Sequence, residues 1–274
     1  MQLEGARIVL TGAGSGLGLA LAREASARGA RLLLVGRGAE ALEAARASLP
    51  SPQRASICVA DVVDPGGRAA IIDLAGRGLG GVDILVNNAG VQSVGALDGH
   101  DDDAIAAMLG TNLAAPLALT RDLLPMLRAA APSRVVNIGS MFGDIAFPLF
   151  AAYSATKFGL RGMSDALRRE LADDGIGITH VAPRAVRTPA FAAYGELEAP
   201  FAMKVDAPEA VAHAIWRAVE RDRDRLYPGL AEQVFRFVHH LAPGIIDSAL
   251  APRLRKARGQ TTSPASVRKP ALRS

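Results

Sequence analysis

Short apolar runs rich in valine, isoleucine and leucine recur about every 25 residues, and alanine-rich stretches with helical periodicity separate them. Continuous runs of this kind are typical of strands buried on both faces of a sheet. The alternation predicts a doubly wound parallel α/β sheet with right-handed crossovers. The expected strands are 7–11, 31–35, 55–59, 83–87, 134–139, 177–181 and 225–227. The expected helices are 16–28, 39–48, 65–76, 101–128 with a break near Pro116, 151–173 and 207–221.

The last part of the chain has a different pattern. Segment 229–251 contains an apolar stripe with helical spacing, formed by Leu230, Val234, Phe237, Val238 and Leu241. Pro243-Gly244 interrupts the helical pattern after this stripe. Such a stripe packs onto its own domain or a partner subunit, covers an apolar pocket as a lid, or lies at a membrane interface. We therefore expect an α/β domain at 1–228, an amphipathic helical segment at 229–251 and a basic tail at 252–274.

The basic character of the chain, with a net charge of +4 and a pI near 9.6, originates in that tail. Of 31 basic residues, seven follow residue 251 with no acidic residue among them, which leaves 24 basic against 27 acidic residues in 1–251. The tail lacks apolar periodicity and is typical of a disordered segment. Because the body is mildly acidic, we favour a solubilising tail over one that attracts anionic lipid or nucleic acid.

Composition restricts the class of protein further. Half of the residues are hydrophobic, enough for a large core, yet no run of about 18 uncharged apolar residues predicts a spanning helix. A single cysteine, Cys58, and a strand that begins almost at the N-terminus predict a cytoplasmic protein without an intramolecular disulfide. No metal site is expected, because none of the five histidines has the spacing of a ligand set; they are His100, His180, His213, His239 and His240.

A glycine-rich loop follows the first expected strand, in Thr11-Gly12-Ala13-Gly14-Ser15-Gly16-Leu17-Gly18. Glycines let the backbone approach a pyrophosphate closely, and the start of the next helix offers free N–H groups. Leu17 stands where Gly-x-Gly-x-x-Gly needs its last glycine, so the pattern is Thr-Gly-x-x-x-Gly-x-Gly. No Gly-Lys-Ser/Thr follows, which excludes the phosphate loop of nucleotide hydrolases.

Tyr153 and Lys157 stand four residues apart in an expected helix, which puts them on one helix face. An ammonium beside a phenol favours the ionised phenol, and a phenol of pKa about 10 needs such help to act as an acid or base near neutrality. The pair alone is common on solvated helices. Together with the glycine loop and Ser140, at the end of the fifth expected strand, it predicts a hydride-transfer site.

In order and spacing, the chain resembles the short-chain dehydrogenase/reductase family in its compact single-domain form, over about residues 5–230. The resemblance rests on the glycine loop, Asn87-Asn88-Ala89-Gly90, Asn112, Ser140 and Tyr153-x-x-x-Lys157. It implies a Rossmann sheet of about seven strands, a nicotinamide cofactor, and a homodimer or homotetramer built on the helices at 114–128 and 151–173. It also implies a catalytic tetrad. In that tetrad Tyr153 transfers the proton, Ser140 orients the substrate oxygen, Lys157 holds the nicotinamide ribose and lowers the tyrosine's pKa, and Asn112 supports a water-linked proton path.

The residues after the second strand indicate which cofactor is bound, because an acidic residue there would bind the adenosine ribose of NAD. The chain has Gly36-Arg37-Gly38 there, and Arg37 can pair with a 2′-phosphate, which predicts NADP. NAD is the alternative if Arg37 is merely solvated. Asp61, before Val62, resembles the family residue that contacts the adenine amino group. The expected cofactor contacts are Thr11, Gly12, Gly14, Ser15, Gly16, Leu17, Gly18, Arg37, Asp61, Val62, Asn88, Ala89, Gly90, Tyr153, Lys157 and Thr188.

One motif departs from the family pattern. Pro-Gly-x-Val-x-Thr is replaced by Pro183-Arg184-Ala185-Val186-Arg187-Thr188. Thr188 remains available for the nicotinamide carboxamide. A residue other than glycine adopts a positive φ only at an energetic cost, so the motif does not predict the conformation of the loop around Arg184.

Seven of the eight phenylalanines lie in segments that the resemblance assigns to the substrate side: Phe142, Phe147, Phe150, Phe191, Phe201, Phe235 and Phe237. They predict an apolar pocket for a lipophilic carbonyl or alcohol, with ordinary core packing as the alternative. The sequence thus predicts an NADP-preferring oxidoreductase. A non-catalytic NADP-binding redox sensor or regulator is the alternative, against which the intact tetrad argues. No nucleic-acid partner is expected, and weak association with a membrane surface through 229–274 is compatible with the late helix and tail.

Overall fold

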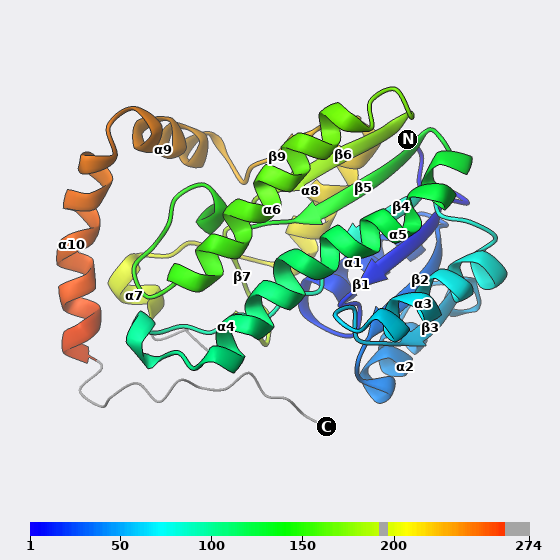
Figure 1. Ribbon diagram of the computed structural model, residues 1–274, viewed down its shortest axis with the longest axis horizontal. Coiled ribbons are helices and arrows are strands. Elements are labelled where there is room, and N and C mark those ends of the chain that lie inside the picture. Colours follow the sequence, from blue (N-terminus) through cyan, green and yellow to red (C-terminus); the bar gives the residue numbers. More distant parts are fainter. Residues whose placement is uncertain (192–196, 261–274) are drawn as a thin grey trace.

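The computed structural model describes residues 1–191 and 197–260, in which a seven-stranded parallel sheet carries helices on both faces (Figure 1). The strand order is β3-β2-β1-β4-β5-β6-β9, and β7 and β8 form a separate parallel pair. The predicted doubly wound sheet is therefore confirmed. The strands are β1 Arg7–Thr11, β2 Arg31–Gly36, β3 Ala55–Val59, β4 Ile84–Asn87, β5 Ser133–Ile138, β6 Ile176–Val181, β7 Ala185–Val186, β8 Val205–Asp206 and β9 Arg225–Leu226.

The helices agree with the expected ranges to within a few residues over most of the domain. They are α1 Gly16–Ala27, α2 Ala39–Ala47, α3 Pro65–Leu74, α4 Asp102–Leu109, α5 Ala115–Ala129, α6 Ala151–Glu170, α7 Glu198–Phe201, α8 Pro208–Glu220, α9 Leu230–Leu241 and α10 Pro243–Gln260. The expected break near Pro116 is a π turn at Gly110–Ala114. Proline has no N–H with which to close the α-helical bond to the carbonyl of residue 112, so the regular helix cannot run through this point unchanged.

Alternate strand residues face opposite sides of the sheet, and both sides are buried. Ile8 and Leu10 belong to one core with α1 and α8, whereas Val9 between them belongs to a second core with α3 and α5. This two-sided burial explains why the strands have continuous apolar runs. The largest buried side chain, Trp216 of α8, also donates its indole N–H to the carbonyl of Leu21, at 3.0 Å.

One stretch, Asp102–Ala129, is long and apolar enough to cross a membrane by length and composition alone. It comprises α4, the π turn and α5, and Leu119, Leu123 and Leu127 of α5 are buried in the second core. A core helix of a water-soluble domain meets the same criterion. One such stretch is therefore weak evidence for a membrane span.

The C-terminal helices α9 and α10 lie beyond the edge of the sheet, at the left of Figure 1. They pack through a third apolar cluster, which includes Phe150, Phe201 and Ile246. The expected interruption at Pro243-Gly244 is present, but α10 continues through Pro252 to Gln260, so residue 251 is not a helix end. Alanine and leucine after residue 248 continue the helix into the basic segment. The rest of the expected tail, 261–274, lies outside the described residues.

Candidate active site

The site begins where the strand order reverses, between β1 and β4 at their carboxyl ends. Thr11, the last residue of β1, accepts hydrogen bonds on Oγ1 from the N–H groups of Asn88 and Ala89, both at 3.0 Å, and donates to the carbonyl of Val86. Asn88 in turn donates through Nδ2 to the carbonyls of Thr11 and Gly12, at 2.9 and 3.1 Å. The segments after β1 and β4 thus form one rigid rim.

Several positions of the loop require glycine because neighbouring atoms lie too close to the backbone to leave room for a Cβ atom. Gly12 has φ +66°, and a Cβ there would lie 2.9 Å from Cα of Ala89. A Cβ at Gly18 would overlap the carbonyl oxygen of Gly12. Gly16 has φ +54°, and its Cβ would lie 3.0 Å from the methyl group of Thr188, so the loop after β6 reaches the glycine loop. The start of α1 is consequently bare backbone, the surface that a pyrophosphate requires.

Tyr153 and Lys157 project from α6, as their spacing predicts. The Nζ of Lys157 donates to the carbonyl of Ile138, at 2.9 Å, and lies 5.6 Å from the ring centroid of Tyr153. Burial lowers the pKa of Lys157 to about 8. The lysine is therefore mainly protonated at neutral pH, with a positive charge beside the phenol.

Asn112 lies in the π turn behind these groups and is buried. Its side chain pairs with the backbone of Val91, accepting from N–H and donating to C=O, both at 2.8 Å, and Nδ2 also donates to Oγ1 of Thr156 at 3.2 Å. Asn112 thereby joins the segment after β4 to α6.

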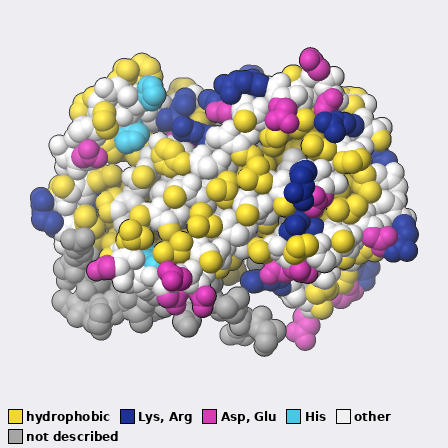
Figure 2. All heavy atoms as spheres, in the orientation of Figure 1, with side chains coloured by type: hydrophobic (Ala, Val, Ile, Leu, Met, Phe, Trp, Pro, Cys, Tyr) yellow, Lys and Arg dark blue, Asp and Glu magenta, His cyan; other side chains and the backbone are white. Residues whose placement is uncertain are grey.

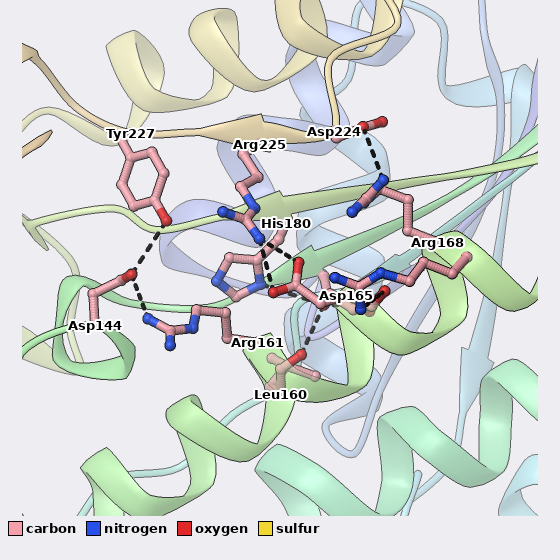
Figure 3. A network of polar contacts seen from close by, with 12 residues as sticks. Asp144, Leu160, Arg161, Asp165, Arg168, His180, Asp224, Arg225 and Tyr227 are labelled. Carbon is pink, nitrogen blue, oxygen red and sulfur yellow. Dashed lines mark hydrogen bonds and ion pairs between the residues drawn. The ribbon is translucent and has the colours of Figure 1, made fainter. Parts of the chain in front are cut away.

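Ser140 begins the turn after β5, where its Oγ accepts a hydrogen bond from the N–H of Phe142, at 3.1 Å. The end of that turn is held by Asp144, whose Oδ1 accepts from Arg161 of α6 at 2.6 Å and from the hydroxyl of Tyr227 at 3.2 Å (Figure 3). Burial, followed by the Asp144 carboxylate, raises the pKa of Tyr227. Arg161 and Tyr227, which are far apart in sequence, thus hold the Asp144 end of the turn that Ser140 begins.

One cavity of about 1400 Å³ joins these parts. It is lined by every expected site residue except Thr11 and Asn112, which brace the rim from behind. Arg37 and Asp61 line the same cavity as Tyr153 and Lys157. The bare glycine cradle and the cavity that continues to Tyr153 fit a nicotinamide dinucleotide.

The remainder of the cavity wall combines apolar and charged side chains. Its four phenylalanines are Phe142, Phe147, Phe201 and Phe235, and its charged residues are Arg184, Lys204, Glu232 and Arg253. Phe142 packs on Phe147 and Phe150 with ring centroids 4.8 and 4.7 Å apart, so Phe150 supports the wall from the core. Phe191 is also buried. The expectation that Phe237 faces the substrate is wrong, because its side chain is 62% exposed on the outer face of α9.

Sequence reasoning missed several lining residues, among them Gln92, Ile145, Met203 and Lys204. They lie on loops or single turns, where no periodicity marks an inward-facing side chain. Only the tertiary arrangement identifies them.

Arg184, the departure from the family motif, is accommodated by ion pairs. Arg184 is not among the described non-glycine residues with positive φ, so it does not need the conformation that glycine allows. Its guanidinium pairs with both oxygens of Asp206, at 2.9 and 3.0 Å, and with Glu232 of α9, at 2.7 Å. The side chain lines the cavity and ties the β7–β8 pair to the C-terminal helix.

Comparison with known proteins agrees with this geometry. The profile of the family described as "short chain dehydrogenase" matches residues 6–199. The chain belongs to the short-chain dehydrogenase/reductase family. A relative named dehydrogenase/reductase SDR family member 7B, from Bos taurus, is 33% identical over 267 residues, which is 92% of this chain and 82% of the relative.

Solved structures agree with the family assignment. A short-chain dehydrogenase from Streptomyces avermitilis is 32% identical with a TM-score of 0.76, covering 94% of this chain and 99% of that one. A 3-ketoacyl-(acyl-carrier-protein) reductase from Brucella melitensis, complexed with NADH, is 26% identical with a TM-score of 0.74, covering 79% and 91%. As a member of this family, the protein is a nicotinamide-dependent dehydrogenase/reductase that acts on CH–OH and C=O groups of small molecules.

A buried histidine lies directly behind the serine turn. The ring of His180, on β6, occupies the space that a Cβ at Gly139 would need, and its Nδ1 lies 3.3 Å from Oγ of Ser164. Burial, with a smaller contribution from the charge of Lys157, lowers the pKa of His180 from 6.5 to about 4.

We expect Gly18→Ala to weaken binding of NADPH and NADH by more than about tenfold, because its methyl group would displace the Gly12 carbonyl. Fluorescence titration of both cofactors measures this effect. Gly162→Ala in α6 is the matched control: nothing lies within 4 Å of its Cβ, so cofactor binding is retained and the helix gains about 1 kcal/mol. Equal cofactor affinities in the two variants would contradict a tight glycine cradle.

His180 makes the stability pH-dependent. Because its pKa is lower in the folded than in the unfolded protein, the unfolded state takes up the proton first, and the free energy of unfolding falls as the pH drops from 6.5 to about 4. The contribution of His180 over this range is about 3 kcal/mol. In His180→Asn we expect a correspondingly smaller decrease, measured by urea unfolding at several pH values with circular dichroism. Parallel curves for the two proteins would show that the histidine pKa is not lowered.

Proposed function

We propose that the protein is an NADP-preferring oxidoreductase for a lipophilic carbonyl or alcohol. The observation that supports this proposal is the single cavity that extends from Arg37, past the glycine loop, to Tyr153 and the phenylalanine wall. The proposed specificity therefore has two parts, one for each end of the cavity.

The cofactor preference rests on Arg37. Residues 36–38, Ala41 and Leu42 line the adenosine end, and the only charged side chains among the described residues lining that end are those of Arg37 and Asp61. A guanidinium at this position pairs with a 2′-phosphate, whereas the carboxylate that would bind a free ribose hydroxyl is missing after β2. The NADH bound in the Brucella structure is a property of that protein.

In the proposed reaction, a bound nicotinamide supplies or accepts the hydride. Tyr153 donates its phenolic proton to the substrate oxygen in reduction and removes it in oxidation. Lys157, protonated and held by the Ile138 carbonyl, stabilises the phenolate that remains. The hydroxyl of Ser140 binds the substrate oxygen. Following the family resemblance, Lys157 also holds the nicotinamide ribose, and Asn112, which joins the segment after β4 to α6, supports a water-linked proton path.

The substrate class is inferred from the wall of the cavity. Four phenylalanines, together with Ile145 and Met203, offer apolar surface to an acyl or alkyl chain. The Brucella relative is named for reduction of a 3-ketoacyl group, a carbonyl on such a chain. Nothing in the described residues favours the non-catalytic sensor.

The proposed assembly is a homodimer or homotetramer through α5 and α6. Leu117 of α5 and Leu109 of α4 are exposed apolar side chains near this face, and proteins of this family are often oligomeric. A cytoplasmic location stays a prediction.

Tyr153→Phe tests the reaction. It deletes the proton donor and keeps the ring, so we expect NADPH affinity to stay within about twofold while turnover of aliphatic and aromatic aldehydes and ketones falls at least about a hundredfold. Turnover is followed by loss of nicotinamide absorbance, and affinity by cofactor fluorescence. Turnover equal to that of the unsubstituted protein would remove Tyr153 from the proposed role.

Arg37→Ala tests the cofactor preference. Loss of a charge-assisted pair should weaken NADPH binding by about tenfold or more and leave NADH binding nearly unchanged. Arg77→Ala, which removes an arginine whose side chain is largely exposed and lies outside the cavity, is the control and should change neither affinity. Equal losses for both cofactors in Arg37→Ala would contradict a 2′-phosphate contact.

A further inference from the structure

The outer face of α9 is the most exposed apolar surface among the described residues. Ten large hydrophobic side chains are exposed among all the described residues, and five of these lie between residues 230 and 245, four on α9 and Ile245 at the start of α10. Their exposed fractions are 80% for Leu230, 61% for Val234, 62% for Phe237, 66% for Leu241 and 60% for Ile245. The four within α9 are spaced four, three and four residues apart, so they form one stripe along the helix. Figure 2 shows hydrophobic side chains gathered over this helix at the upper left.

This stripe does not belong to the packing of α9 on its own domain. The inner face of the helix makes that contact, because Phe235 and Val238 pack on the third apolar cluster. Two polar contacts add to it: Glu232 pairs with Arg184 at 2.7 Å, and the guanidinium of Arg236 lies 4.8 Å from the ring centroid of Tyr227. With its inner face held in this way, α9 presents the stripe outward on a rigid support.

The neighbouring helix supplies positive charge. α10 packs against α9 and carries Arg253, Arg255 and Lys256, of which the last two are exposed. From residue 248 to the end of the chain there is no acidic residue. On α9 the one carboxylate, Glu232, is paired with Arg184. On α10 the one carboxylate, Asp247, stands against Arg253, Arg255 and Lys256, so the net charge of this surface is positive.

We propose that α9 and α10 form a docking surface for a bilayer that contains anionic lipids. The stripe from Leu230 to Ile245 enters the boundary between head groups and acyl chains, and the cations of α10 contact the anionic head groups. Phe235 and Arg253 line the cavity, so docking brings the cavity rim beside the acyl chains. That last consequence rests on the proposed function, because it matters only for a lipophilic substrate.

A second copy of the chain fits this surface less well. In a two-fold pair the same patch meets itself, so the cations of two α10 helices would be brought together with Asp247 as the one acidic side chain on each α10 to offset them. An anionic bilayer complements both the apolar stripe and the charge.

Cosedimentation of the full chain with phosphatidylcholine vesicles, with and without phosphatidylserine, tests the proposal without using turnover. We expect pelleting with the phosphatidylserine vesicles, weaker pelleting with phosphatidylcholine alone, and a decrease when salt is raised to about 0.5 M. Val234→Ser and Phe237→Ser together should lower the partition coefficient at least about tenfold. Arg255→Gln with Lys256→Gln should lower binding severalfold, and only to the anionic vesicles.

Val59→Ser is the matched control, since Val59 is 53% exposed on the edge strand β3. The strand that precedes α9 in the chain, β9, forms the opposite edge of the sheet. The control variant should pellet as the unsubstituted protein does. Circular dichroism and NADPH fluorescence check that each variant is folded, and they keep the result separate from the proposed function. Pelleting that is absent, or equal in the α9 variant and Val59→Ser, would overturn the proposal. Light scattering without vesicles tests self-association through the same surface. If the unsubstituted protein does not bind vesicles and the α9 variant has a lower mass than it, the surface is a contact between copies of the chain, and the proposal is overturned.

Discussion

The reversal of the strand order at the neighbouring strands β1 and β4 is the constraint on which the rest of the structure depends. Two-sided burial of the sheet requires helices on both faces, and the strand order reverses at this pair. The segments that leave the two strands diverge, and hydrogen bonds between Thr11 and Asn88 hold the rim in place. Because only glycine fits at positions 12, 16 and 18, the rim remains bare backbone. A site for a dinucleotide follows from how the sheet is wound.

The reactive groups are assembled around the end of β5 by contacts to backbone atoms. Lys157 is anchored on the Ile138 carbonyl, and Asn112 binds both the backbone N–H and the backbone C=O of Val91. The serine turn is closed from the other side by Asp144, which Arg161 and Tyr227 hold. A backbone anchor restricts the rotamers of a long side chain, so the Lys157 ammonium is held near the Tyr153 ring.

The C-terminal helices connect this site to the outer surface. Arg184 occupies a glycine position of the family motif, and its two carboxylate partners come from β8 and α9. The same helix contributes Phe235 to the cavity wall and Leu230, Val234 and Phe237 to the exposed stripe. One helix therefore has an inner face that shapes the pocket and an outer face available to a partner surface.

The sequence by itself determined the elements and the local motifs. The apolar pattern predicted all seven sheet strands to within one residue at each end. Fixed spacings marked the glycine loop and the Tyr153–Lys157 pair, because these motifs depend on neighbours within a few residues. Only the tertiary structure decided that Phe237 points outward while Phe235 lines the cavity, and that Arg184 meets Asp206 and Glu232. An amphipathic stripe is compatible with several coverings, and the partners of Arg184 are 22 and 48 residues away. Contacts over such separations are set by how whole elements pack, which no local pattern contains.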